Sequence, residues 1–181
     1  MTEQDLRTLL MAWENLDILA QDMITQDNHL QMLFNIALDD RNPENWRAAY
    51  IADKVNALCP ERIAPYIDTM IKSLTAGTNS SLKRHFLKLI SLHPIPEEHL
   101  SFLLNFCLDC FCSSSEPVAV RVHAMQILFN ISEYEPDFKP ELLEIIEHES
   151  ELHSSPGILS RGRKLSQQLR KQIKASGTPF V

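Results

Sequence analysis

The chain has 181 residues, a formal net charge of −7, 44% hydrophobic residues and only 4 glycines. This composition is ordinary for a folded domain, and the scarcity of glycine argues against a doubly wound α/β enzyme with phosphate-binding turns. No stretch is long and apolar enough to cross a bilayer, and the acidic start lacks the pattern of an export signal. We therefore expect one cytoplasmic domain whose 4 cysteines are thiols.

The charge is distributed unevenly along the chain. Residues 1–151 carry 11 Lys and Arg against 24 Asp and Glu, which is a net charge of −13. Residues 152–181 carry six Lys and Arg and no acidic residue, which is a net charge of +6. Such a split indicates a functional tail or face near the end of the chain.

Two short amphipathic segments come first. Apolar residues from Leu6 to Trp13 and from Leu16 to Met23 recur three and four positions apart. This spacing places them on one face of a helix. We predict that residues 1–26 form an N-terminal helical cap.

Four pairs of amphipathic segments follow. Short polar breakers separate the partners of a pair, and prolines separate one pair from the next. No run alternates with the period of two that a strand would have, so the predicted class is all-α. The predicted helical hairpins span residues 29–59, 62–93, 97–132 and 137–174. With the cap they form a single repeat domain, residues 1–175, and a flexible tail follows at residues 176–181.

An arginine recurs near the start of the second helix in each hairpin. The arginines are spaced 37, 37 and 40 residues apart, and each follows a helix-starting Pro or Ser by four or five positions. That period is at the edge of the range for two-helix repeat units. The four residues are Arg47, Arg84, Arg121 and Arg161.

Residues 38–49 resemble the signature of the HEAT repeat family. In that family a first helix ends near an Asp, here Asp39 or Asp40, and a second begins with an Arg and small apolar residues, here Arg47 and two alanines. Residues 117–131 are similar.

The resemblance covers roughly residues 29–174. It implies a right-handed α–α superhelix of about four hairpins, and it implies an interaction scaffold, since most HEAT proteins have that role. A minority of related bacterial proteins bind DNA, including helical-repeat glycosylases that remove alkylated bases.

The family also implies a structural ladder in which the four arginines pair with acids between the helices. Asp39 or Asp40 fits the acid position, whereas Asn79 and Glu116 occupy it in the next two hairpins. Each arginine would then bond a neighbouring carboxylate or a helix C-terminal carbonyl group. Alternatively, because equivalent positions of a solenoid align, the guanidinium groups would form a phosphate-binding stripe.

The last predicted helix contains the only basic cluster of the sequence. One interpretation is a partner-binding surface for an acidic protein or a nucleic acid backbone. The other is the wettable outer face of a terminal repeat, with cations favoured near a helix C-terminus. The cluster comprises Arg161, Arg163, Lys164, Arg170, Lys171 and Lys174.

Two groups that suggest metal ligands have simpler explanations. Cys107, Cys110 and Cys112 lack the second ligand pair that zinc sites use, so packing thiols are the better interpretation. His148 and His153 are five residues apart, about 140° around a helix, so they do not match the i, i+4 pair of metalloproteases.

An aromatic group resembles part of a base-excision site. Trp46, Arg47, Tyr50 and Asp53 lie at helical spacings, and Trp13 is the only other tryptophan. Such residues serve equally well as packing between hairpins.

These observations predict no catalytic residue, no cofactor and no metal, and therefore no enzyme, since no nucleotide loop or triad order is present. We predict a non-catalytic protein-binding scaffold with an unknown protein partner, or a homodimer through the last helix, and no membrane contact. The alternative is a nucleic-acid-binding HEAT-like protein related to bacterial alkylated-DNA repair glycosylases.

Overall fold

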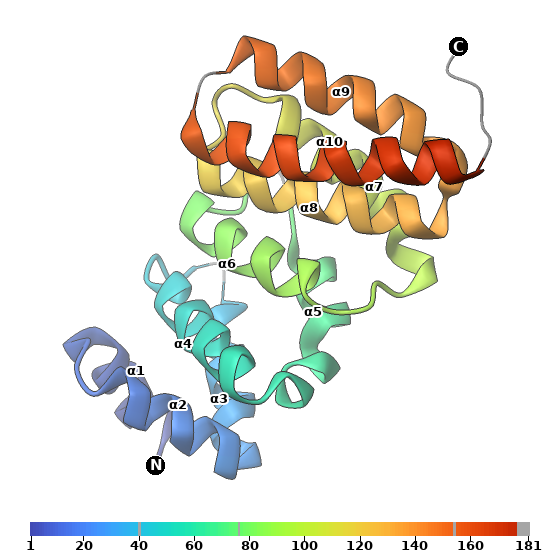
Figure 1. Cartoon of the computed structure of the whole chain (residues 1–181). Coiled ribbons are helices and arrows are strands. Elements are labelled where there is room, and N and C mark those ends of the chain that lie inside the picture. The colour runs from blue at the N-terminus through green and yellow to red at the C-terminus, as the bar shows by residue number, and fades with distance from the viewer. Residues whose placement is uncertain (40, 76, 154, 177–181) are drawn as a thin grey trace. The chain divides into compact units, whose positions relative to one another are not determined.

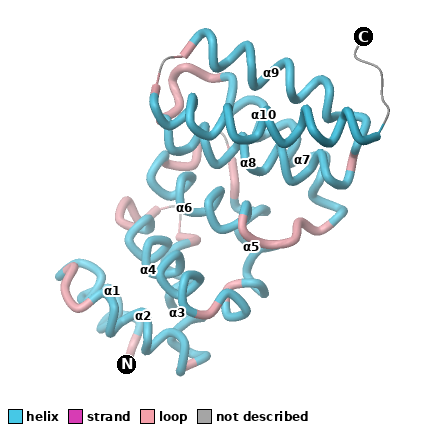
Figure 2. Tube along the Cα trace, viewed as in Figure 1, coloured by secondary structure: helices cyan, strands magenta, loops and turns pink. Residues whose placement is uncertain are grey.

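The structure is a computed structural model that describes residues 1–39, 41–75, 77–153 and 155–176. These residues form ten α-helices and four short 3-10 helices, and they contain no strand (Figure 1, Figure 2). The chain divides into two compact units, residues 1–93 and 94–181, and each is described by itself. The predicted all-α class is confirmed. None of the described helices has the length and apolarity needed to cross a membrane.

The first unit is built around α4, against which α2, α3 and α6 pack. The faces that meet there carry small or branched apolar side chains, among them Ala48, Ile51, Ala52 and Val55, all fully buried. The helices of this unit are α1 Glu3–Ala12, α2 Leu16–Thr25, α3 Asp27–Ala37, α4 Asn45–Leu58, η1 Pro60–Arg62, η2 Ala64–Tyr66, α5 Ile67–Ser73 and α6 Ser80–Ser91.

The turn between α1 and α2 has an unusual backbone. Trp13 ends α1 with a φ of 57°, and Asn15 precedes α2 with a φ of 52°. The left-handed region is rare for a bulky residue, so contacts elsewhere must offset its cost. The Trp13 ring packs against Trp46 and Tyr50 of α4, with ring centroids 5.3 and 5.1 Å away. These contacts hold α1 against α4.

The first helix of the second predicted hairpin is shorter than its apolar pattern suggests. The 3-10 turns η1 and η2 occupy the beginning of this segment, and α5 starts only at Ile67. Pro65 lacks a backbone N–H, and its ring clashes with the carbonyl group four residues earlier. A regular α-helix therefore cannot extend through it from residue 62.

The second unit is a set of four long helices with short 3-10 turns before two of them. In Figure 1, α10 runs alongside α9 and α8, and both of these helices pack against it. The helices of this unit are η3 Glu97–His99, α7 Leu100–Cys112, α8 Val118–Tyr134, η4 Pro136–Phe138, α9 Lys139–Leu152 and α10 Pro156–Ser176.

The last helix packs through one apolar stripe, as its sequence predicts. Ile158, Leu165, Leu169 and Ile173 are at most 2% exposed. Gly162 lies in the same stripe, where an added Cβ would come within 2.7 Å of Ser150 Oγ on α9. The absence of a side chain therefore allows α9 and α10 to approach closely, and the side of α10 opposite the stripe remains in solvent.

The boundary between the two compact units falls between the hairpins expected at residues 62–93 and 97–132. The hairpin expected at residues 137–174 corresponds to α9 and α10. Of the expected tail, residues 176–181, only Ser176 is described, as the last residue of α10, and the others lie outside the described residues.

Candidate functional site

The exposed side of α10 carries a row of cations. Five of the six predicted partner-binding residues lie there and are exposed to solvent. We call them the basic face; they are Arg163, Lys164, Arg170, Lys171 and Lys174. They occur at positions that recur three, four and seven apart, so they share one side of the helix.

Arg161 lies on a different side of α10. Its guanidinium Nη1 donates to Gln126 Oε1 of α8 at 2.6 Å, and the residue is half-buried. This arginine therefore fixes α10 to α8 and does not belong to the basic face.

Most of the basic face has no acidic partner. Arg170 donates to Glu147 Oε1 of α9 at 2.7 Å, as an exposed pair. Arg163, Lys164, Lys171 and Lys174 form no ion pair with any residue that the structure describes. Four positive charges therefore remain without a counter-charge among the residues that the structure describes.

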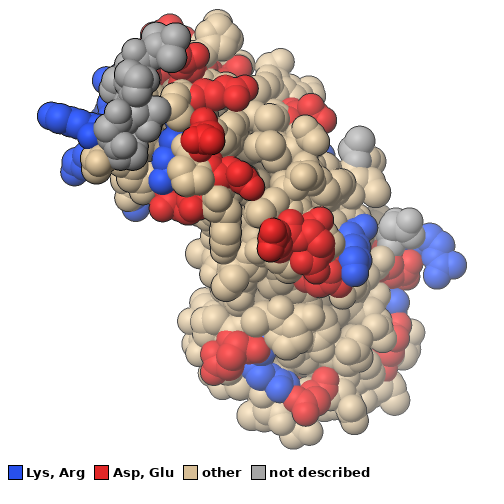
Figure 3. All heavy atoms as spheres, turned by 90° about the vertical axis from the view of Figure 1, so that its right-hand side faces the viewer, with Lys and Arg blue, Asp and Glu red and all other residues tan. Residues whose placement is uncertain are grey.

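The neighbouring helix α9 has the opposite charge. Its solvent side carries four carboxylates, which we call the acidic face: Glu141, Glu144, Glu147 and Glu151. Figure 3, which looks onto the end of this unit where α10 finishes, shows Lys and Arg side chains on one side and Asp and Glu side chains beside them. The terminal hairpin thus presents two parallel strips of opposite charge.

A groove runs between the two strips. Glu147 and Glu151 lie on its α9 wall, and Arg163 and Arg170 lie on its α10 wall. Uncharged residues line the rest of the groove, namely Ser150, Leu159, Gly162, Ser166 and Gln167. The surface combines a shallow depression with complementary charge on its two edges, which is a feature of protein docking surfaces rather than of an enclosed reaction centre.

The recurring arginines bond groups within the fold, and most of these partners are distant in the sequence. Arg47 donates from Nη1 to the carbonyl oxygens of Leu10 and Met11 at 3.1 and 3.3 Å, at the end of α1. Arg84 Nη2 lies 2.9 Å from His85 Nε2.

Arg121 repeats the arrangement of Arg47 in the second unit. It donates from Nε to the Phe111 carbonyl oxygen at the end of α7 at 2.7 Å, and from Nη2 to Glu149 of α9. Both arginines thus bond helix C-terminal carbonyl groups, which carry partial negative charge.

Asp39 pairs with other arginines than Arg47. Asp39 contacts Arg41 and Arg7, at 3.3 and 3.6 Å. Asp40 lies outside the described residues. The link between successive loops is made by amides instead: Asn79 Nδ2 donates to Asn45 Oδ1 at 3.0 Å, and Asn45 Nδ2 donates to the Asp39 carbonyl oxygen at 3.3 Å.

The aromatic group of the first unit is a packing cluster. The Arg47 guanidinium carbon lies 5.0 Å from the Trp13 ring centre and 5.3 Å from the Trp46 ring centre. The guanidinium group of Arg47 therefore lies over both tryptophan rings. Asp53 points to α6, where its Oδ2 is 2.7 Å from Lys88 Nζ. The carboxylate and the tryptophans therefore do not converge on one point.

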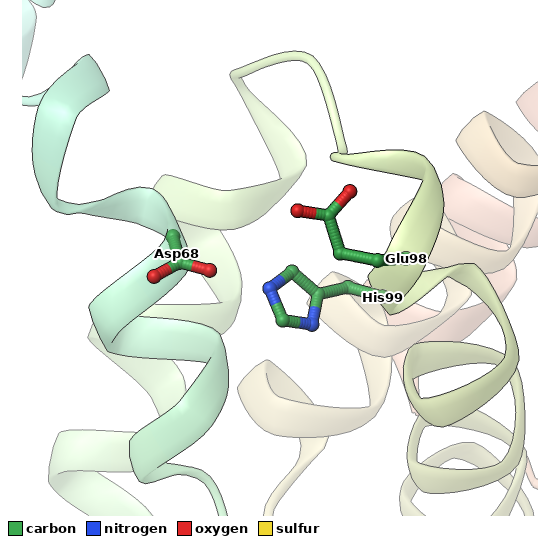
Figure 4. Close-up of side chains that lie close together, drawn as sticks. All are labelled: Asp68, Glu98 and His99. Atoms are coloured by element: carbon green, nitrogen blue, oxygen red, sulfur yellow. The ribbon is translucent and has the colours of Figure 1, made fainter.

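Two further groups contain residues of types that bind metals. In the first group the cysteines differ in burial, and the second group has too few ligands within one unit. Cys107 and Cys110 are buried, whereas Cys112 is exposed. Figure 4 shows Glu98 and His99, consecutive residues of the second unit, together with Asp68 of the first unit. Only Glu98 and His99 belong to one unit, and two ligands are too few for a metal centre.

The comparison with known families fits this arrangement. A model described as a HEAT repeat domain matches residues 4–169, which is most of the chain. The chain belongs to the HEAT repeat family, whose members are helical repeat scaffolds and are generally non-catalytic. No curated protein and no solved structure matches it.

Proposed function

We propose that this chain is a non-catalytic protein-binding scaffold and that the outer surface of the terminal hairpin, α9 with α10, is its docking surface. The observation that carries the proposal is the row of four cations on α10 that have no acidic partner in the described part of the chain. A bound protein would supply the missing negative charge. Electrostatic complementarity of this kind orients partners and accelerates their encounter.

The chemistry of the basic face favours an acidic helix or an acidic extended segment as the partner. The cations of α10 are presented along about three turns of a regular helix, and a helical partner would match that spacing. The groove beside the cations offers Leu159 for an apolar contact.

A titration of a labelled, Glu-rich amphipathic peptide with the purified chain tests this function. We expect binding that weakens when salt rises from 0.1 to 1 M, because screening then acts over about 3 Å. The variant carrying Lys164→Glu and Lys171→Glu should bind at least about tenfold more weakly. The matched control, Arg41→Glu with Lys72→Glu, makes the same charge change on exposed side chains of the first unit and should bind as the wild type does.

A second titration, with a short DNA duplex, distinguishes protein binding from the alternative function, nucleic-acid binding. Equal peptide binding by the wild type and the α10 variant would contradict the proposal. Binding of the duplex alone, sensitive to salt and to the same two substitutions, would instead support the nucleic-acid-binding role.

Two further elements belong to this proposal. The partner is another protein, or a second copy bound through the last helix. The setting is the cytoplasm, which is supported by the 4 free cysteines, because thiols persist in a reducing compartment.

A further inference from the structure

The terminal hairpin carries both the basic face and a helix of the kind that the basic face should bind. The solvent side of α9 has four glutamates, and the solvent side of α10 has five Lys or Arg residues. The two strips are parallel and adjacent, because α9 and α10 pack along their length. A surface with this arrangement is complementary to itself.

We propose that the partner of the terminal hairpin is a second copy of this chain, bound so that α9 of each copy lies over α10 of the other. The proposal rests on the proposed function, since it names the partner of that same surface. A two-fold axis running along the groove produces this arrangement, because rotation about it exchanges the two strips. Such a closed contact uses the same patch on both copies.

The contacts within one hairpin fix which residues would meet. Residues Ser150 and Gly162 lie at one height along the hairpin, and Glu147 and Arg170 lie further toward the end of α10. A two-fold axis parallel to the helices preserves height. Glu151 of one copy therefore comes over the region of Arg163 of the other, and Glu144 comes over the region of Lys171.

These four residues have no ion-pair partner among the described residues of their own chain. The proposed dimer therefore creates charge pairs without breaking existing ones. A two-fold axis that instead stacked α9 on α9 and α10 on α10 would bring like charges together, which is unfavourable. The charge pattern selects one of the two simple geometries.

The size of the surface sets the expected strength. α9 has 14 residues. At 1.5 Å per residue such a helix is about 21 Å long, and two helices side by side have a footprint of roughly 400 Å² per copy. That is at the low end of specific interfaces, so we expect a transient dimer with a dissociation constant on the order of micromolar.

Sedimentation velocity with two charge-swapped variants tests the proposal. One variant carries Glu144→Lys and Glu151→Lys, so the four positions that would face one another, 144, 151, 163 and 171, are all basic. The other carries Arg163→Glu and Lys171→Glu, so these four positions are all acidic. We expect the wild type to dimerise as its concentration rises through the micromolar range, less so in 1 M salt. Each variant alone should be monomeric, and their equimolar mixture should dimerise.

Because all four substituted side chains are exposed, circular dichroism should show that both variants are folded. A wild type that stays monomeric through the micromolar range, or a mixture of the variants that stays monomeric while the wild type dimerises, overturns the second copy as partner. Neither result bears on the peptide titration, so binding of the Glu-rich peptide by a monomeric chain would leave the proposed function intact.

Discussion

Arg121 and Glu149 form a buried ion pair in which Arg121 Nη2 donates to Glu149 Oε2 at 2.7 Å. Their side chains are only 4% and 7% exposed, and the arginine also bonds the Phe111 carbonyl oxygen. One side chain of α8 thereby joins the end of α7 to the last turn of α9. The pair thus positions α9, the helix that carries the acidic face.

Removal of one partner of this pair should be costly. Because an uncompensated charge would remain buried, Arg121→Met should lower the free energy of unfolding by about 3–5 kcal/mol. Urea denaturation followed by circular dichroism gives the value. Arg170→Met breaks the exposed Arg170–Glu147 pair and should cost no more than about 1 kcal/mol. Equal losses in the two variants would show that the buried pair has no special role.

The Asn45–Asn79 contact should contribute separately from the helix cap that Asn79 also provides. Asn79 Oδ1 accepts from the Leu82 backbone N–H at 2.9 Å, and its Nδ2 donates to Asn45. Asn79→Asp keeps the capping oxygen and loses the donor, so it should cost about 1 kcal/mol. Asn79→Ala loses both and should cost about twice as much. Identical denaturation midpoints for the two variants would contradict this division.

The close approach of α9 and α10 at Gly162 can be tested by a double-mutant cycle. In the wild-type background Gly162→Ala places a Cβ 2.7 Å from Ser150 Oγ and should destabilise the unit. In a Ser150→Ala background that oxygen is absent, and the higher helix propensity of Ala should stabilise by up to about 1 kcal/mol. The cycle is read from thermal melts of the four chains, and a coupling near zero would argue against contact at this position.

The stability of the first unit should depend on pH through Asp53. Burial raises the pKa of Asp53, but the bonds from His85 and Lys88 outweigh it, and the pKa lies below its ordinary value of 3.8. A carboxyl group with a lowered pKa stabilises the fold above its unfolded pKa, and this contribution is lost as the pH falls through the folded pKa. Asp53→Asn should therefore be less stable than the wild type at pH 7, and the difference should shrink below about pH 4. Urea denaturation across this range measures it, and a difference that is constant with pH would contradict the assignment.

The sequence predicts much of the local structure because helical periodicity is a local property. The buried stripe of α10, with Leu165 and Leu169, and the separate basic residues follow directly from their spacing. The long-range polar partners could not be predicted in this way. Glu149 lies 28 residues from Arg121, and Asn45 lies 34 residues from Asn79.

The departures from the predicted pattern have local physical causes that act against periodicity. Pro65 prevents a regular α-helix before Ile67, although apolar residues there continue the helical spacing. Arg161 belongs to the basic cluster in sequence, but it lies toward α8 because its position on the helix is next to the buried stripe. The charge of a segment could be predicted, whereas the neighbour that each side chain contacts depends on packing.

Zero-length carbodiimide cross-linking tests the central claim, that the basic face of α10 is where protein carboxylates dock. The reagent joins a lysine to a carboxylate only when they are in contact. A mixture of unlabelled and nitrogen-15-labelled chains, cross-linked at micromolar concentration with the Glu-rich peptide present, distinguishes links between molecules from links within one. We expect the intermolecular links to concentrate on Lys164, Lys171 and Lys174. Intermolecular links confined to Lys54, Lys72 and Lys88 of the first unit would contradict it.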